Sequence, residues 1–240
     1  MSKSKFIFAT LLPRDLERCE EECVGRVLKE WDKFKDGYES LRIIIGSAHK
    51  KSLTKAKAML PDKYKETAEL IHCPFNYTEQ MSEIRAHEIG FCKRFLHQYI
   101  LDMCYEHFLY WIDSDMYISF GDVDRWVKKL THSSFFITFP YCVRNGLAAP
   151  PEQFGAYVIN TARLTPDTLK TMYQTNFKKN TICRIGAPDC EFKKALLKAG
   201  GKEFRAEDIT SEHYSDVESN IENIRYKYTY DKGKCFRSKW

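Results

Sequence analysis

Two aspartates separated by one residue, Asp113 and Asp115, come directly after the apolar run 108–112. Carboxylates placed where a buried strand reaches solvent are costly unless a partner neutralises them. Mg²⁺ and Mn²⁺ favour carboxylate oxygens, and proteins commonly hold them with one or two carboxylates together with the phosphates of a substrate. The spacing therefore predicts a divalent-cation site, and the simpler interpretation is that the two aspartates turn the chain.

The elements that must position these aspartates alternate along the first half of the chain. Apolar, β-branched runs predict strands at 6–12, 41–46, 69–73 and 108–112. Apolar residues spaced three or four apart predict helices at 16–34, after Ser47 and at 77–105. Such alternation is typical of a mostly parallel α/β sheet with helices on both faces, whose ligands bind beyond the carboxyl ends of the strands.

The second half of the chain shows a different order. Strands are expected at 135–141 and 154–160, separated by a loop rich in Gly and Pro at 144–151. Helices are expected to begin at about residue 165 and at Pro188, and the second should end at Gly200, before a short strand at 202–206. Because no internal repeat or linker interrupts this pattern, we expect one domain over residues 1–240.

Composition disfavours several classes of protein. Of the 240 residues 43% are hydrophobic, yet no apolar run approaches the roughly 18 residues that span a bilayer, and the run at 6–12 lacks the features of a signal peptide. The net charge of +5 is spread along the chain without clustered basic and aromatic residues, which disfavours nucleic-acid binding. Nine cysteines without a Cys-x-x-Cys pair look like core thiols of a reducing compartment, so we expect a cytoplasmic location.

The segment 110–116, Tyr-Trp-Ile-Asp-Ser-Asp-Met, resembles the Asp-x-Asp motif of GT-A glycosyltransferases, in which the carboxylates and the donor's diphosphate share Mn²⁺ or Mg²⁺. A second block is similar in order, with acidic residues before Phe192, a helix ending at Gly200, a short strand and then His213. The resemblance implies a GT-A fold, a nucleotide-sugar donor with UDP-sugars favoured, and a glycan or other hydroxyl acceptor. Residues 1–116 would form the Rossmann-like, nucleotide-sugar-binding half, and 117–240 the acceptor-binding half with a C-terminal tail.

Carried onto this sequence, the resemblance implies a metal site formed by Asp113, Asp115 and His213, with Glu212 as a substitute for the histidine. The donor is expected to contact these aspartates together with Thr10, Leu11, Ser47, Arg85 and Ser114. Arg85 is preferred to Lys93 and Arg94, which qualify on the same helix. Ser47 has a second interpretation, as the cap of the helix that follows it.

A catalytic base is expected on the helix that begins at Pro188. Asp189 would take the proton of the acceptor hydroxyl in an inverting reaction, with Glu191 in reserve, while the metal stabilises the leaving diphosphate. A carboxylate in the first turn of a helix is also favoured by the helix dipole, which is the competing interpretation. The family has a Glu-Asp pair where this chain has Pro188-Asp189, so the stereochemical outcome stays open. Gly155 begins a strand that resembles the family's small-residue wall around donor sugar and acceptor.

Two rival enzyme classes fail on spacing. A polymerase-type nucleotidyltransferase needs its paired aspartates soon after a Gly-Ser step, whereas a strand and a long helix separate Gly46-Ser47 from Asp113. A sugar-nucleotide pyrophosphorylase needs a Gly-rich basic loop after its first strand, and residues 11–15 contain no glycine. The alternative left open is a non-catalytic module of a larger protein that binds sugar nucleotides or glycans.

Overall fold

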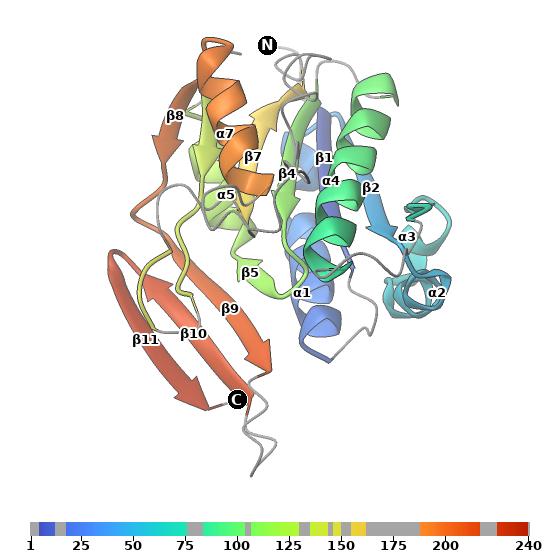
Figure 1. Ribbon diagram of the computed structural model, residues 1–240, viewed down its shortest axis with the longest axis horizontal. Coiled ribbons are helices and arrows are strands. Elements are labelled where there is room, and N and C mark those ends of the chain that lie inside the picture. The colour runs from blue at the N-terminus through green and yellow to red at the C-terminus, as the bar shows by residue number, and fades with distance from the viewer. Residues whose placement is uncertain are drawn as a thin grey trace.

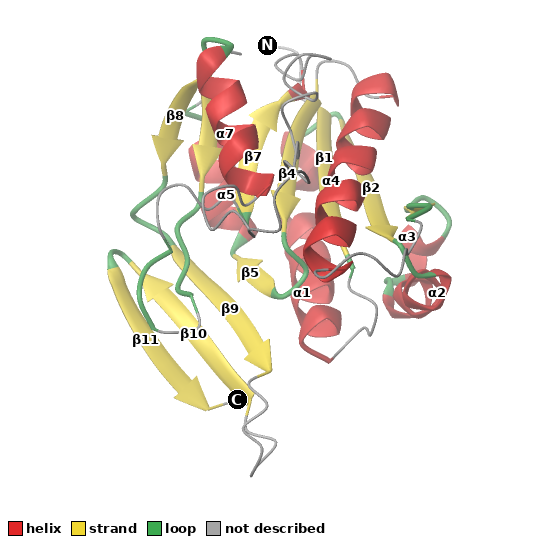
Figure 2. Cartoon of the chain, in the orientation of Figure 1, coloured by secondary structure: helices red, strands yellow, loops and turns green. Residues whose placement is uncertain are grey.

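The computed structural model describes residues 5–12, 18–75, 84–103, 107–129, 135–143, 146–149, 155–161, 188–216 and 225–239. Two β-sheets and the helices around them give this part of the chain an α/β architecture (Figures 1 and 2). Among the described residues, no helix is both long enough and apolar enough to cross a membrane.

A seven-stranded sheet forms the centre of the molecule, in the order β3-β2-β1-β4-β7-β6-β8. Its strands are β1 (Lys5–Leu11), β2 (Ser40–Ser47), β3 (Glu69–His72), β4 (His107–Ile112), β6 (Phe135–Thr138), β7 (Ala156–Asn160) and β8 (Lys202–Arg205). Neighbouring strands are parallel except where β7 pairs with β4 and with β6. The mostly parallel α/β sheet predicted from the sequence is confirmed.

Helices cover both faces of this sheet (Figure 2). They are α1 (Arg18–Phe34), α2 (Lys50–Met59), α3 (Asp62–Lys65), α4 (Ile84–Met103), α5 (Phe120–Val127) and α7 (Pro188–Lys198), with a 3₁₀ turn at Lys35–Gly37. Side chains alternate along β1, so Phe6 packs toward Trp31 of α1 while Ile7 packs on the other face, in the cluster that includes Leu96 of α4. The large sheet therefore lies between two hydrophobic cores, one on each of its faces.

The predicted helices are confirmed where the structure describes them. Helix α4 occupies most of the range expected at 77–105, and residues 77–83 and 104–105 lie outside the described residues, as does the helix expected at about residue 165. The suggestion that Ser47 caps α2 is wrong, because the residue at that cap is His49. The Ser47 hydroxyl instead donates to the Leu12 carbonyl at 3.2 Å and accepts the His49 N–H at 3.1 Å.

Gly46 in β2 lets α4 approach the sheet closely. A Cβ placed at this position would lie 2.3 Å from Cδ1 of Leu96, which is much closer than two carbon atoms can pack. Helix packing therefore explains the glycine at the end of β2. The same contact holds α4 against the strands whose carboxyl ends form the candidate site.

A second, four-stranded sheet follows the order β11-β10-β9-β5 and is antiparallel throughout. Its strands are β5 (Met116–Ile118), β9 (Thr210–Asp216), β10 (Arg225–Asp231) and β11 (Lys234–Lys239). The last described residues of the chain, where a C-terminal tail was expected, form β11, which pairs with β10 and through it with β9, beside the large sheet (Figure 1).

Five residues, here called the α1 polar network, connect the small sheet to α1: Arg26, Glu30, Tyr117, Glu212 and Tyr214. Arg26 donates to the Glu212 carboxylate at 2.7 Å and to the Tyr214 hydroxyl at 2.9 Å. Its guanidinium lies 3.5 Å above the Tyr117 ring, and the Tyr117 hydroxyl donates to Glu30. Charge-assisted hydrogen bonds of this kind are the stronger ones in proteins, so the network anchors β5 and β9 to the helix.

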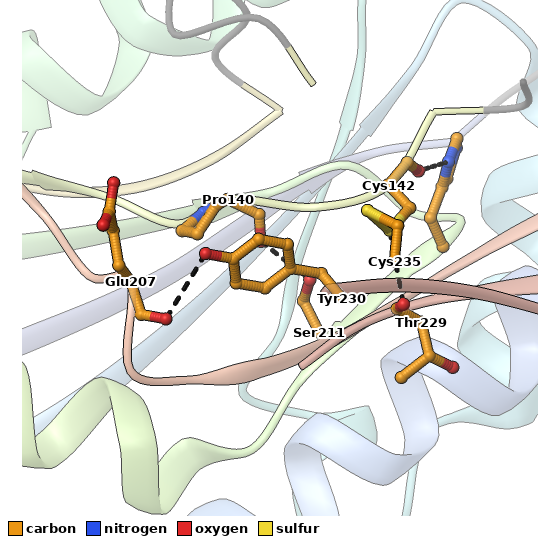
Figure 3. The surroundings of a disulfide bond; sticks show 8 residues. Pro140, Cys142, Glu207, Ser211, Thr229, Tyr230 and Cys235 are labelled. Atoms are coloured by element: carbon orange, nitrogen blue, oxygen red, sulfur yellow. Dashed lines mark hydrogen bonds between the residues drawn. A yellow bond between two sulfur atoms is a disulfide. The ribbon is translucent and has the colours of Figure 1, made fainter. Parts of the chain in front are cut away.

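Cys142 and Cys235 form a disulfide bond (Figure 3), although 93 residues separate them in the sequence. Cys23, Cys73 and Cys92 are buried and free. The prediction of core thiols is confirmed for these three and wrong for the bonded pair, because folding brings together two cysteines whose spacing gives no sign of pairing. Disulfides form and persist mainly in oxidising surroundings, so the cysteines no longer support a reducing compartment.

Candidate metal and donor site

Asp113, Ser114 and Asp115 form the turn between β4 and β5. The N–H of Met116 donates to the Asp113 carbonyl at 3.0 Å, and the N–H of Asp113 donates to the Gly155 carbonyl at 2.9 Å. The side chains of Asp113 and Asp115 are 32% and 31% exposed. The two aspartates therefore turn the chain, as the simpler interpretation has it, and also present carboxylates at the carboxyl end of a buried strand.

Strand pairing brings His213 to Asp115. Met116 of β5 lies opposite His213 of β9, and the N–H of Tyr214 donates to the Asp115 carbonyl at 2.9 Å. Nε2 of His213 consequently lies 3.4 Å from Oδ2 of Asp115. Of the three predicted metal ligands, these are the two that the structure brings together.

The backbone fixes the other nitrogen of the His213 ring. Nδ1 lies 2.9 Å from the carbonyl oxygen of Cys142. A carbonyl oxygen can only accept, so we assign a proton to Nδ1, and Nε2 is the ring nitrogen that faces Asp115. Histidines that bind metals usually donate their second N–H in this way.

Asp113 pairs with a buried lysine. Nζ of Lys93 lies 3.0 Å from Oδ1 of Asp113, and Nε1 of Trp111 donates to the same oxygen at 3.2 Å. The Lys93 side chain is 5% exposed, so Asp113 supplies the opposite charge that burial of an ammonium requires. Lys93, which the sequence ranked below Arg85, is thus the α4 residue seen at the acidic pair. The structure describes the backbone of Arg85 but not its side chain, and its donor contact stays a prediction.

Gly155 leaves room for the Asp113 carboxylate. A Cβ at this position would lie 3.1 Å from Oδ2 of Asp113 and 3.1 Å from Sδ of Met116. Both distances are tighter than ordinary contacts, so a larger residue would push on the carboxylate. Tyr157, two residues further along, is buried in the core, where its hydroxyl hydrogen-bonds His97.

Thr10, Leu11 and Ser47 lie at the carboxyl ends of β1 and β2, where donor contacts were expected. Thr10 and Ser47 are fully buried, and Leu11 is partly buried. The Ser47 hydroxyl is already engaged by backbone groups, whereas the Thr10 hydroxyl has no hydrogen-bond partner among the described residues. Direct contact of these three residues with a donor stays a prediction.

Helix α7 begins at the same edge of the sheet. The chain reverses at 199–201 and continues into β8, which is parallel to β6, so the first turn of α7 lies toward the carboxyl ends of the strands (Figure 1). Phe192 packs 5.4 Å from the His97 ring and 5.6 Å from the Tyr157 ring. Asp189 and Glu191 belong to this docked first turn. The structure does not describe their side chains, so their role as base stays a prediction.

Glu212 points away from His213, because successive residues of a strand face opposite sides. Its carboxylate belongs to the α1 polar network. Burial acts to raise the pKa of Glu212, but hydrogen bonds from Tyr214 and Arg26 outweigh it and hold that pKa below its ordinary value. The suggestion that Glu212 substitutes for His213 as a metal ligand is therefore wrong.

No family model and no curated protein matches this chain. Similar solved structures include a glycosyltransferase involved in glycosylation of the major capsid of PBCV-1, with a TM-score of 0.42 and 10% identity over 83% of this chain and 80% of that chain. Another is glucosyl-3-phosphoglycerate synthase from Mycobacterium tuberculosis with Mn²⁺, UDP-glucose and phosphoglyceric acid, with a TM-score of 0.43 and 14% identity over 83% and 81%.

A third similar structure is 4-diphosphocytidyl-2C-methyl-D-erythritol synthase from Anaerococcus prevotii, with a TM-score of 0.46 and 11% identity over 84% of this chain and 86% of that chain. These neighbours are GT-A-type glycosyltransferases and a related nucleotidyltransferase. Because all three TM-scores lie below 0.5, the likenesses do not decide the activity. It has to be argued from the residues of this chain.

The carboxylate of Asp115 and the imidazole of His213 could supply part of the coordination shell of a divalent cation. Among the described residues, no three His, Cys, Asp or Glu side chains converge into a complete metal-binding group. One carboxylate and one imidazole nitrogen nevertheless suit an ion that takes its remaining ligands from diphosphate oxygens and water. Asp113 directs one carboxylate oxygen to Lys93, so its contact with an ion, direct or through water, stays a prediction.

Proposed function

We propose that this protein is a glycosyltransferase that moves a sugar from a nucleotide-diphosphate sugar to a hydroxyl acceptor. Asp115 and His213 would hold Mn²⁺ or Mg²⁺ at the donor. The observation that carries the proposal is the approach of the His213 Nε2 atom to within 3.4 Å of Asp115 Oδ2, at the sheet edge where α/β proteins bind ligands. A UDP-sugar is the first donor to test, and a glycan is the expected acceptor.

The proposed chemistry divides among neighbouring residues. The cation would supply positive charge for the departing diphosphate. Lys93, buried beside Asp113, adds a resident positive charge at the same edge of the sheet. Asp189 is the proposed base that takes the acceptor's proton in an inverting reaction, with Glu191 in reserve, because α7 starts at this edge.

The test is release of free nucleoside diphosphate from a panel of UDP-, GDP- and dTDP-sugars, with Mn²⁺ and with a chelator. Asp115→Asn removes the metal-binding charge, and Asp122→Asn makes the same chemical change at an α5 residue paired with Arg125. We expect Mn²⁺-dependent release from one donor. It should be lost in Asp115→Asn and retained in Asp122→Asn.

Two other outcomes reject the proposal in different ways. Metal-dependent binding of a nucleotide without release, with a range of simple sugars as acceptors, would favour the non-catalytic binding module. If the protein neither releases a nucleoside diphosphate nor binds any nucleotide of the panel in a metal-dependent way, both the glycosyltransferase and the binding module are excluded.

A further inference from the structure

The disulfide bond involves the residue whose backbone orients His213. The carbonyl of Cys142 accepts the Nδ1–H of His213 at 2.9 Å, and the sulfur of the same residue is bonded to Cys235 on β11 (Figure 3). Cys142 thus contacts the candidate metal ligand through its main chain and the C-terminal strand through its side chain. Breaking the bond at the Cys142 sulfur can therefore affect the His213 ring through the carbonyl of the same residue.

The register of the small sheet places both partners of Cys142 on one face. His213 of β9 lies opposite Tyr228 of β10, and Tyr230 of β10 lies opposite Cys235 of β11. Residues directly opposite each other, and residues two apart on a strand, project from the same face. Cys142, which is fully buried, covers this face and bridges it from β9 to β11.

Other contacts hold the same segment less directly. The Ser211 hydroxyl donates to the Pro140 carbonyl at 2.7 Å, two residues before Cys142 (Figure 3). Tyr141 and Val143 exchange backbone hydrogen bonds with residues 147–149, which belong to the same loop. Cys142 itself makes an isolated bridge to Ala148 and belongs to no strand ladder. The disulfide is thus the covalent tie at the residue whose carbonyl sets the His213 ring.

We propose that the Cys142–Cys235 disulfide is a positioning element for His213. It holds the Cys142 carbonyl in place, which keeps the hydrogen bond from Nδ1 of the imidazole and keeps Nε2 directed at Asp115. Reduction of the bond releases this constraint and weakens binding of a divalent cation. The part that concerns the cation rests on the proposed function, whereas the hydrogen bond between His213 and the Cys142 carbonyl is a property of the chain alone.

The first experiment reads the His213 ring without any metal. ¹H–¹⁵N NMR of the full chain, with His213 assigned by comparison with His213→Gln, detects the Nδ1–H proton, which gives a signal when a hydrogen bond protects it from exchange with water. A phosphine reductant gives the disulfide two electrons, two protons complete the two thiols, and the phosphine becomes its oxide with oxygen from water. We expect the Nδ1–H signal in the oxidised protein and its loss, through exchange with water, after reduction.

The control is the double variant Cys142→Ser with Cys235→Ser. It should lack the Nδ1–H signal with or without reductant, which would assign the effect to this bond and not to Cys23, Cys73 or Cys92. Cys142→Ala with Cys235→Val keeps apolar packing and replaces the serine pair if that pair unfolds. Circular dichroism and thermal melting establish that each compared sample is folded.

The second experiment titrates Mn²⁺ and follows the free ion by electron paramagnetic resonance. Partners that orient metal-binding histidines typically change metal affinity about 10–100-fold when lost, so we expect roughly tenfold weaker binding in the reduced protein and in the double variant. In the His213→Gln background, removing the disulfide should cause no further loss, because the coupling runs through His213. A merely structural role would weaken binding in both backgrounds.

A folded, reduced protein that keeps the Nδ1–H signal would overturn the inference, since the Ser211 contact would then suffice to place the segment. Equal Mn²⁺ affinity before and after reduction would overturn it as well. If the wild-type protein binds no Mn²⁺, the proposed function fails, while the measurement of the His213 hydrogen bond still decides the role of the disulfide.

Discussion

At the residue scale, the two aspartates of the turn have different partners. Asp115 faces Nε2 of His213, so a carboxylate and an imidazole nitrogen lie together at the proposed cation site. Asp113 faces the ammonium of Lys93, which already neutralises it. The Asp-x-Asp pattern therefore does not supply two equivalent ligands, and the difference was hidden from the sequence because it depends on which side chains of α4 and β9 reach the turn.

The first prediction concerns Lys93. Changing Lys93→Met removes a buried positive charge near the cation site, so we expect Mn²⁺ binding to become stronger by roughly 1 kcal/mol, or about fivefold. Loss of the partner of Asp113 should lower the free energy of unfolding by about 1–3 kcal/mol. Mn²⁺ titration and urea denaturation measure the two effects.

Arg94→Met is the matched control, because it removes the same charge from the next residue of α4, whose side chain is exposed. It should leave both quantities nearly unchanged. Equal effects of the two variants would show that net charge, and not the contact with Asp113, is responsible.

At the element scale, the large sheet was predictable and the small one was missed. The strands β1, β2 and β4 are continuous apolar runs, and the helices between them keep a regular apolar spacing. In β10, Tyr226, Tyr228 and Tyr230 alternate with polar residues, and this period of two is typical of a strand with one buried face. The pairing of the three-residue strand β5 with β9 had no local signal, since it joins segments far apart in the chain.

Contacts between distant segments also determine what the sequence could and could not predict at the site. The position of His213 was proposed from family order, but its partner Cys142 acts through a backbone carbonyl, which no residue type reveals. Glu212 and His213 looked interchangeable as neighbours in sequence. Strand alternation separates them, because one belongs to the α1 polar network and the other faces Asp115.

A second prediction follows from the layer formed by α4, β4 and β7. His97 is fully buried, its Nδ1 donates to the Lys93 carbonyl and its Nε2 accepts from the Tyr157 hydroxyl. The pKa of His97 is lowered from 6.5 to about 3, chiefly by burial; the hydrogen bond to the Lys93 carbonyl opposes this shift, and the Lys93 charge adds to it. The unfolded chain therefore takes up a proton between these pH values and the folded chain does not, so stability falls as pH decreases through this window.

We expect His97→Gln to flatten the dependence of the free energy of unfolding on pH between about 6.5 and 3, although the variant is less stable at neutral pH. Tyr157→Phe removes one hydrogen bond but keeps the imidazole, so it should cost about 1 kcal/mol and retain the slope. Urea denaturation at a series of pH values measures both. A His97→Gln variant with the wild-type slope would contradict this account.

At the scale of the whole molecule, the small sheet is held to the rest by the α1 polar network and by the disulfide. Glu212→Gln should lower the free energy of unfolding by about 1–3 kcal/mol, because Arg26 loses its carboxylate partner. Since the pKa of Glu212 is held low, its contribution is present above the ordinary value of 4.5 and is lost as pH falls through the folded-state pKa. Urea denaturation at several pH values measures this loss.

His213→Gln should affect Mn²⁺ binding and stability in the opposite way from Glu212→Gln. It should weaken Mn²⁺ binding strongly and change stability little, whereas Glu212→Gln should keep Mn²⁺ binding within about twofold, since its side chain faces the other side of β9. Loss of Mn²⁺ binding in Glu212→Gln at a pH where the variant is folded would show that the two faces of β9 are not independent.

The central claim is that Asp115 and His213 form a cation site for a nucleotide diphosphate. The most direct measurement is isothermal titration calorimetry of UDP, and then of GDP and dTDP, with Mn²⁺ and with a chelator, for the wild type and Asp115→Asn. The account predicts binding of one nucleotide that requires Mn²⁺ and is lost in the variant. Nucleotide binding that persists with the chelator, or that Asp115→Asn leaves unchanged, would contradict it.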